Sequence, residues 1–193
     1  MELTLHRGKC FLDEGPLIRE RDLFGCRACR KVWGPPRPPQ GNPKAEVILV
    51  SRNPDPRERD HLGVEEEMLR VMGIPQEEVY RTYSVFCSTP GNRIPFQLEL
   101  VKCSSWKAWE MRMLSNAKFV ITLGVDATRQ FLGLKTPTTN KTFWEVHQVS
   151  LGGRDLFVFP CHHPRYALQN SDGLPPLAEW CQAVGEFIRE RRS

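Results

Sequence analysis

The chain has 193 residues, of which 40% are hydrophobic, so it is long enough to bury a core and is not composed like a disordered protein. Its net charge of +4 permits a nucleic-acid partner but does not require one. No apolar run reaches the roughly 18 residues that cross a bilayer, and the N-terminus lacks the apolar centre of a signal peptide. We therefore expect a single domain, 1–193, in a soluble, cytoplasmic, monomeric protein with no membrane partner.

The first half of the chain alternates predicted strands and helices. A proline-rich loop over 33–43 precedes a short apolar run over 45–51, which predicts a buried parallel strand. A helix over 65–72 ends at Gly73. A second strand is predicted over 79–86 from its β-branched and aromatic residues.

The second half continues the alternation. The predicted elements are a helix over 95–114, either continuous or broken near Ser104 and Ser105, a buried strand over 117–124, a short helix over 126–133 with Asp126 as its N-cap, a hairpin over 142–160 that turns at Gly152-Gly153, and a C-terminal helix over 175–192. This order predicts an α/β fold with a mostly parallel sheet. Ligands of such sheets bind beyond the carboxyl ends of the strands, which points to the loops 51–63, 86–95 and 160–168.

Seven cysteines leave several interpretations open. Disulfides do not persist in a reducing cytosol, and an odd number cannot pair completely. Buried thiols are the simplest alternative. Cys26 and Cys29 have the C-x2-C spacing that lets two thiolates reach one metal centre, and Cys87 and Cys103 are able to complete a four-sulfur set. Zinc and an iron–sulfur cluster both suit four thiolates.

One block of sequence resembles a known family. CSTPGNRIPFQLELVKC, which begins at Cys87, is similar to the C-x(2)-P-x-N-R-x-P-x(3)-E-x(3)-C block of the iron–sulfur members of the uracil-DNA glycosylase superfamily. KFVITLGVDATRQFLG, CHHPRYAL and CRAC resemble further motifs of that family, in the same order along the chain. The resemblance implies a three-layer αβα fold with a central, mostly parallel four-stranded sheet.

The resemblance also implies a cofactor. Cys26, Cys29, Cys87 and Cys103 would ligate a structural [4Fe-4S] cluster, with an N-terminal arm of about residues 1–44 contributing the first two ligands. No redox role follows from the motifs.

Two residues are the expected catalytic groups on this resemblance. Asn53, in the Asn-Pro form of the motif after the first strand, would position the attacking water, whereas the iron–sulfur families usually carry Ala there. His163, before Pro164, would donate to the departing base. Asn-Pro is also a common turn dipeptide, a lone His is commonly structural, and His162 is an alternative to His163.

The resemblance also implies a set of substrate-binding residues, of which two depart from the family pattern. The set is Arg52, Pro54, Tyr83, Asn92, Arg165 and Tyr166. Arg52 replaces a Glu, Tyr83 replaces the Asn that reads uracil, and the loop 57–69 lacks the stacking Phe of the family. These losses suggest a pocket for a base other than uracil, such as a bulky modified pyrimidine of phage DNA.

Two functional hypotheses follow. The first is a monofunctional DNA glycosylase that acts on a flipped-out damaged or modified base and leaves an abasic site, in repair or in defence against foreign DNA. The alternative is a catalytically inactive relative that binds DNA or a replication or repair partner.

Overall fold

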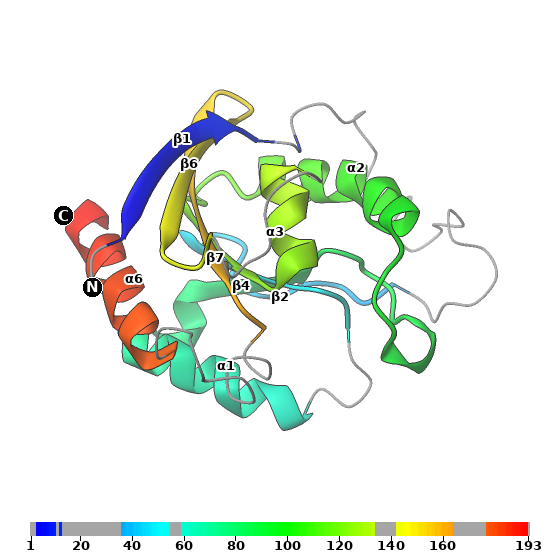
Figure 1. Cartoon of the computed structure of the whole chain (residues 1–193), viewed down its shortest axis with the longest axis horizontal. Coiled ribbons are helices and arrows are strands. Elements are labelled where there is room, and N and C mark those ends of the chain that lie inside the picture. The colour runs from blue at the N-terminus through cyan, green and yellow to red at the C-terminus, as the bar shows by residue number, and fades with distance from the viewer. Residues whose placement is uncertain are drawn as a thin grey trace.

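A computed structural model describes residues 3–10, 12, 36–54, 59–133, 142–163 and 177–192. In this part of the chain seven strands form one sheet, in the order β1-β6-β7-β5-β3-β4-β2 (Figure 1). The strands are β1 Thr4–Lys9, β2 Gln40–Gly41, β3 Val47–Ser51, β4 Val79–Tyr83, β5 Phe119–Leu123, β6 Glu145–Leu151 and β7 Arg154–Cys161. The helices are α1 Arg59–Met72, α2 Gln97–Met113, α3 Val125–Leu132 and α6 Leu177–Arg192, with 3-10 turns η3 Gln76–Glu78 and η4 Pro90–Asn92.

The centre of the sheet is parallel. β3 pairs in parallel with β4 and with β5, and β5 pairs in parallel with β7. These four strands confirm the predicted parallel core. The sheet is wider than predicted, because β2 adds antiparallel to β4, β6 adds antiparallel to β7, and β1 adds parallel to β6.

Helices cover both faces of the sheet, which confirms the three layers. Along β3, Val47 and Leu49 pack with α1 and α6 on one face, because successive side chains of a strand point to opposite sides. Ile48 and Val50 pack with α2 and α3 on the other face. Figure 1 shows α1 and α6 together on one side of the sheet and α2 and α3 on the opposite side. Burial of both faces explains why β3 reads as a continuous apolar run.

The crossing of α1 and α6 depends on a glycine. A Cβ atom on Gly185 would lie 2.3 Å from the Met72 carbonyl oxygen, so only glycine lets α6 approach the end of α1 this closely. The C-terminal helix α6 therefore packs closely against the C-terminal end of α1.

Most predicted elements are confirmed within a few residues, and four details differ. α1 begins at Arg59, six residues before the start predicted for that helix. α2 runs through Ser104, whose hydroxyl donates to the Leu100 carbonyl oxygen at 2.8 Å, so the helix is continuous. α3 begins at Val125 with Gly124 as N-cap, so the assignment of Asp126 as N-cap is wrong. β1 was not predicted, because its mostly exposed residues lack an apolar pattern.

Some predicted residues lie outside the described part of the chain. They are Cys26, Cys29, Arg165 and Tyr166. Among the described residues, the helices are all too short or too polar to cross a bilayer.

Candidate active site

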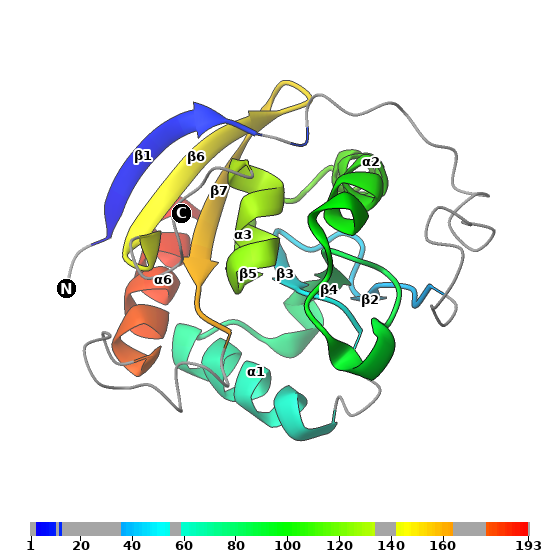
Figure 2. The same ribbon diagram turned by 45° about the vertical axis from the view of Figure 1, so that its right-hand side comes forward.

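The carboxyl ends of the parallel strands meet at one edge of the sheet. Asn53 follows β3, Gly124 follows β5, and His163 follows β7. In Figures 1 and 2 the green segment between β4 and α2 descends to the same end of the molecule at which β7 ends. The described parts of the loops that the sequence singled out therefore begin at the edge where α/β proteins bind ligands.

The side-chain amide of Asn53 is buried and held in one orientation. Only 7% of the residue is exposed. Its Nδ2 donates to the Pro54 carbonyl oxygen at 3.2 Å, to the Thr89 hydroxyl at 3.4 Å and to Asn92 Oδ1 at 3.2 Å. Its Oδ1 accepts from Arg52 Nε at 2.8 Å. An amide oxygen has two lone pairs, and within the described residues Arg52 makes the one hydrogen bond to Oδ1, so the second acceptor position suits a water molecule.

Arg52 connects Asn53 to the turn η4. Its Nη2 donates to the main-chain oxygen and to Oδ1 of Asn92, both at 3.2 Å. The Arg52 guanidinium therefore bridges Asn92 and Asn53. It binds the oxygen of the Asn53 amide, whereas Thr89 accepts from the amide nitrogen. We call Arg52, Thr89 and Asn92 the amide clasp of Asn53. Arg52 and Asn92 were predicted to contact substrate, and here both bond to Asn53.

The turn that carries Asn92 is itself rigid. Gly91 and Asn92 adopt left-handed conformations with φ of 59° and 54°, a region in which Gly and Asn are the best-tolerated residues. The Thr89 hydroxyl donates to the Arg93 carbonyl oxygen at 2.6 Å and closes the turn. The sequence Pro-Gly-Asn-Arg therefore builds a tight loop that presents the Asn92 amide to the end of β3.

The two adjacent histidines have different environments. His162 is 2% exposed, its ring lies 4.8 Å from the Phe143 ring, and burial lowers its pKa below the ordinary value. His163 is partly exposed and packs against Gly124, where a Cβ would lie 3.7 Å from His163 Cβ. His162 is therefore a core residue, and His163 is the more exposed of the two, at the end of β7 on the same edge of the sheet as Asn53 after β3.

The remaining predicted substrate residues lie close to β3. Pro54 is buried beside Asn53. Tyr83 ends β4 in register with Ser51 and is 8% exposed. Tyr83 thus occupies the edge predicted for it, but little of its surface is open to a ligand.

Asp126, which the sequence predicted as a helix N-cap, lies in the first turn of α3, two residues after the Gly124 that packs against His163. Burial raises the pKa of its carboxyl group, and the positive charges of Arg52 and Arg129 act in the opposite direction.

The described cysteines fall into two groups. Burial raises the pKa of Cys161, and of Cys181 to about 12, so both are neutral packing thiols. Cys103 is buried and Cys87 is partly exposed. The Arg37 amide donates to the Phe86 carbonyl oxygen at 2.8 Å, so the chain that leaves Cys29 arrives beside Cys87 eight residues later. Four cysteines are a donor set that suits a four-thiolate group, and two of them, Cys87 and Cys103, lie in the described part of the chain.

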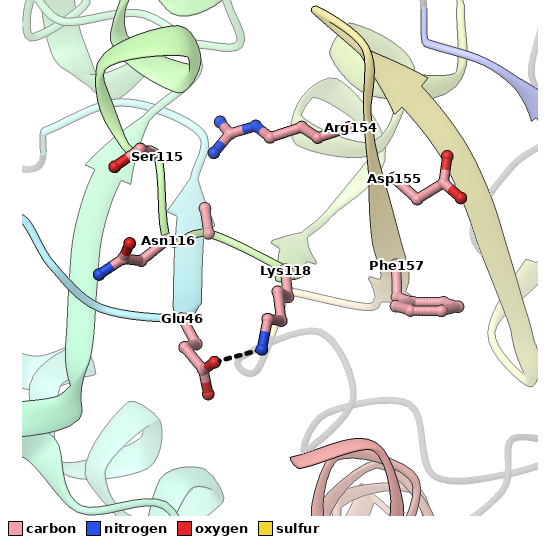
Figure 3. Close-up of a pocket in the computed structure, with 8 residues that line it drawn as sticks. Glu46, Ser115, Asn116, Lys118, Arg154, Asp155 and Phe157 are labelled. Carbon is pink, nitrogen blue, oxygen red and sulfur yellow. Dashed lines mark ion pairs between the residues drawn. The ribbon is translucent and has the colours of Figure 1, made fainter.

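A groove at the opposite end of the sheet holds none of the predicted site residues. It is lined by residues at the amino ends of β3 and β5, including Glu46 and Lys118, which form an ion pair at 2.6 Å (Figure 3). Two further polar side chains of its lining donate to main-chain oxygens, Asn116 to Lys44 and Arg154 to Met111 and Leu114. We assign the functional site to the carboxyl edge.

The sequence is similar to known proteins over most of its length. Residues 38–185 match the family described as the Uracil DNA glycosylase superfamily. The chain is 28% identical to a type-4 uracil-DNA glycosylase of Saccharolobus solfataricus, covering 94% of this chain and 88% of the relative. It is 27% identical to a type-4 uracil-DNA glycosylase of Archaeoglobus fulgidus, covering 89% of this chain and 92% of the relative. It is 30% identical to a type-4 uracil-DNA glycosylase of Thermotoga maritima, covering 68% of this chain and 70% of the relative. The family predicted from the cysteine-bounded block is confirmed: this chain belongs to the uracil DNA glycosylase superfamily.

Proposed function

We propose that the protein is a monofunctional DNA glycosylase that hydrolyses the N-glycosidic bond of a flipped-out base and leaves an abasic site. The observation that carries this proposal is the clasped amide of Asn53 at the end of β3, on the same edge as His163. The names of the relatives support the reaction class. A buried amide whose oxygen keeps one acceptor position is suited to orient a water molecule.

The chemistry assigns one role to each group. Asn53 Oδ1 accepts a hydrogen bond from water and holds the water oxygen toward C1′ of the deoxyribose. The C1′–N bond breaks and its electron pair leaves with the base, while the water oxygen bonds to C1′. An O–H bond of this water breaks, and its proton passes through solvent to the departing base anion, so a hydroxyl remains on C1′. His163 donates a hydrogen bond to the oxygen of the leaving base and stabilises its negative charge.

We propose a bulky modified pyrimidine, rather than uracil, as the base that is released. The position at which the family motif carries an Asn to read uracil is Tyr83, which is mostly buried and cannot offer an amide. The position before the catalytic motif is Arg52, whose guanidinium is bonded to Asn53 and Asn92. A pocket without the uracil-reading amide favours a base with other polar groups.

We further propose that Cys26, Cys29, Cys87 and Cys103 hold a structural [4Fe-4S] cluster. Bonding of the thiolates to iron would add to folding stability. Cys87 and Cys103 flank the segment that contains Thr89 and Asn92. A cluster that held both cysteines would therefore also fix the amide clasp of Asn53. Iron and sulfide content with a thiolate-to-iron absorbance would support the cluster. Zinc in colourless protein would contradict it.

The test of activity uses the purified protein and its Asn53→Ala/His163→Ala variant. DNA carrying uracil, no modification, or large natural base modifications is incubated with each, and released base is measured by mass spectrometry. We expect the wild type to release only a modified base, and the variant to lose release by orders of magnitude while it still binds DNA. Release of uracil would overturn the proposed base. No release from any DNA, with binding unchanged in the variant, would favour a DNA-binding protein without catalysis.

A further inference from the structure

An exposed hydrophobic surface lies next to the candidate active site. Within the described residues six large hydrophobic side chains are exposed, and four of them fall in one stretch of eight residues. They are Ile94, Phe96, Leu98 and Val101, which we call the apolar ridge. Leu98 and Val101 lie three residues apart on α2, so they share one face of the helix. Apolar side chains gathered in this way mark an interaction surface.

The aromatic ring of the ridge is held in place from beneath. The Arg93 guanidinium lies 3.8 Å from the centroid of the Phe96 ring. Arg93 is fixed in turn by Glu99, with Nη1 to Oε2 at 3.0 Å and Nη2 to Oε1 at 2.8 Å. Glu99 Oε2 also accepts from the Phe96 amide at 2.6 Å. One face of the ring is therefore covered by a cation, yet Phe96 is still 62% exposed, so its other surface is open and ordered.

The ridge is continuous with the clasp of Asn53. Phe96 lies four residues after Asn92, whose amide bonds to both Arg52 and Asn53. Arg93 is the next residue after Asn92, and the exposed Lys102 lies on the first turns of α2, close enough to Glu99 to lower the pKa of its carboxyl group. The ridge is thus bordered by two cations and begins where the site ends. Cations beside an exposed aromatic ring are the combination that binds the backbone and the bases of a single strand.

We propose that the apolar ridge binds single-stranded DNA, with an unpaired base next to the target nucleotide stacked on the open face of Phe96. Lys102 contacts the phosphate backbone of the same strand. This inference rests on the proposed function only in taking DNA as the ligand. Stacking on an aromatic ring is worth about 1–3 kcal/mol per base and tolerates any base sequence. The ridge would therefore add affinity without adding base specificity.

The test compares Phe96→Ala with Met113→Ala. Met113 is 64% exposed at the far end of the same helix and has the same hydrophobic character, so it controls for loss of an exposed apolar side chain. The probe is a fluorescein-labelled single-stranded oligonucleotide with a tetrahydrofuran abasic analogue, which cannot be cleaved. We expect Phe96→Ala to raise Kd by about fivefold or more, Phe96→Trp to retain binding, and Met113→Ala to leave Kd unchanged.

The salt dependence separates stacking from charge. Phe96→Ala should leave the slope of log K against log salt concentration unchanged, whereas Lys102→Ala should reduce it by about 0.7, the value for one phosphate contact on a single strand. Equal Kd values for Phe96→Ala and wild type would overturn the proposal. So would light scattering that shows a dimer dissociated by Phe96→Ala, which would assign the ridge to a second copy of this chain.

The outcome is independent of the glycosylase assay. If the wild type releases no base but Phe96→Ala still weakens binding of the oligonucleotide, the proposed activity fails and the stacking surface stands. If the wild type releases base and Phe96→Ala binds the oligonucleotide normally, the activity stands and the stacking surface fails.

Discussion

The side-chain amides of Asn53 and Asn92 are hydrogen-bonded to each other across 39 residues of sequence, with Asn53 Nδ2 donating to Asn92 Oδ1 at 3.2 Å. This contact joins the end of β3 to the turn η4, so the two most distinctive motifs of the chain form one structure. The contact also fixes the orientation of the Asn53 amide. Its nitrogen donates to Asn92, and its oxygen accepts from Arg52 Nε.

Asn92→Ala should slow base release more than it weakens DNA binding. The substitution removes an acceptor of the Asn53 amide and the contact of Arg52 Nη2 with Asn92 Oδ1, whereas the contact of Arg52 with the main-chain oxygen of residue 92 remains. The Asn53 amide should therefore lose its fixed orientation, and kcat should fall about tenfold or more with little change in KM. Asn116→Ala is the control, because the Asn116 amide is exposed and bonds to Lys44 at the opposite end of the sheet. Single-turnover kinetics give the comparison. A rise in KM alone would show that Asn92 contacts substrate and does not position Asn53.

The two histidines should separate into a catalytic and a structural residue. His163→Ala should lower kcat by about 10²–10³, as expected for removal of a donor to a developing anion, with normal stability. His162→Ala should destabilise the fold by about 1–3 kcal/mol, because His162 is buried against Phe143. Denaturant unfolding and base-release rates are measured for both variants. The reverse pattern would assign the motif histidine to position 162.

Removing one partner of the buried ion pair beneath β4 should destabilise the fold strongly, whereas replacing both partners by apolar residues should destabilise it little. Lys107 is fully buried, and its Nζ lies 2.5 Å from Glu110 Oε2 and 2.6 Å from the Thr82 hydroxyl. Lys107→Met should destabilise by about 3–5 kcal/mol, since it leaves the Glu110 carboxylate buried without its cation. Lys107→Met/Glu110→Leu should cost much less than the sum of the single changes. A double-mutant cycle by urea unfolding that shows additivity would contradict this coupling.

Gly185→Ala should destabilise the packing of α6 on α1 by about 1–3 kcal/mol, because the added Cβ meets the Met72 carbonyl oxygen. Gly63→Ala is the matched control: Gly63 lies in α1 with open space around it, and the change should stabilise by about 0.5–1 kcal/mol through helix propensity. Thermal unfolding measures both. Equal shifts for the two variants would mean that the helices separate easily.

The ion pair of Glu46 should give a small, pH-dependent contribution to stability. The hydrogen bond from Lys118 lowers the pKa of Glu46 below its ordinary value of 4.5, burial opposes this, and Arg192 adds to the lowering. A carboxyl group with a lowered folded pKa stabilises above the unfolded pKa and loses that contribution as the pH falls through the folded pKa. Glu46→Gln should therefore cost about 0.2–1 kcal/mol at neutral pH, and the difference should shrink as the pH falls below the unfolded pKa of 4.5 and be lost once the pH has passed the lowered folded pKa. Unfolding free energies across this range test it, and a difference that persists at low pH would contradict the ion-pair origin.

The sequence by itself determined the order of the central elements and the edge at which the site forms. β3 and β5 are continuous apolar runs because both faces are covered, and this signal is local enough to read without a structure. Gly152 and Gly153 likewise marked the hairpin, since both adopt positive φ. The family followed from motif residues whose spacing is visible in the chain.

The tertiary structure decided the features that depend on contacts between distant segments. The clasp of Arg52, Thr89 and Asn92 around Asn53 requires η4 to fold back to β3, and nothing in the local pattern specifies that approach. β1 was missed because an exposed edge strand gains its stability from pairing with β6, not from an apolar face of its own. The choice between His162 and His163 was also beyond the sequence, because adjacent residues after a strand point to opposite sides and only packing against Phe143 shows which one is buried.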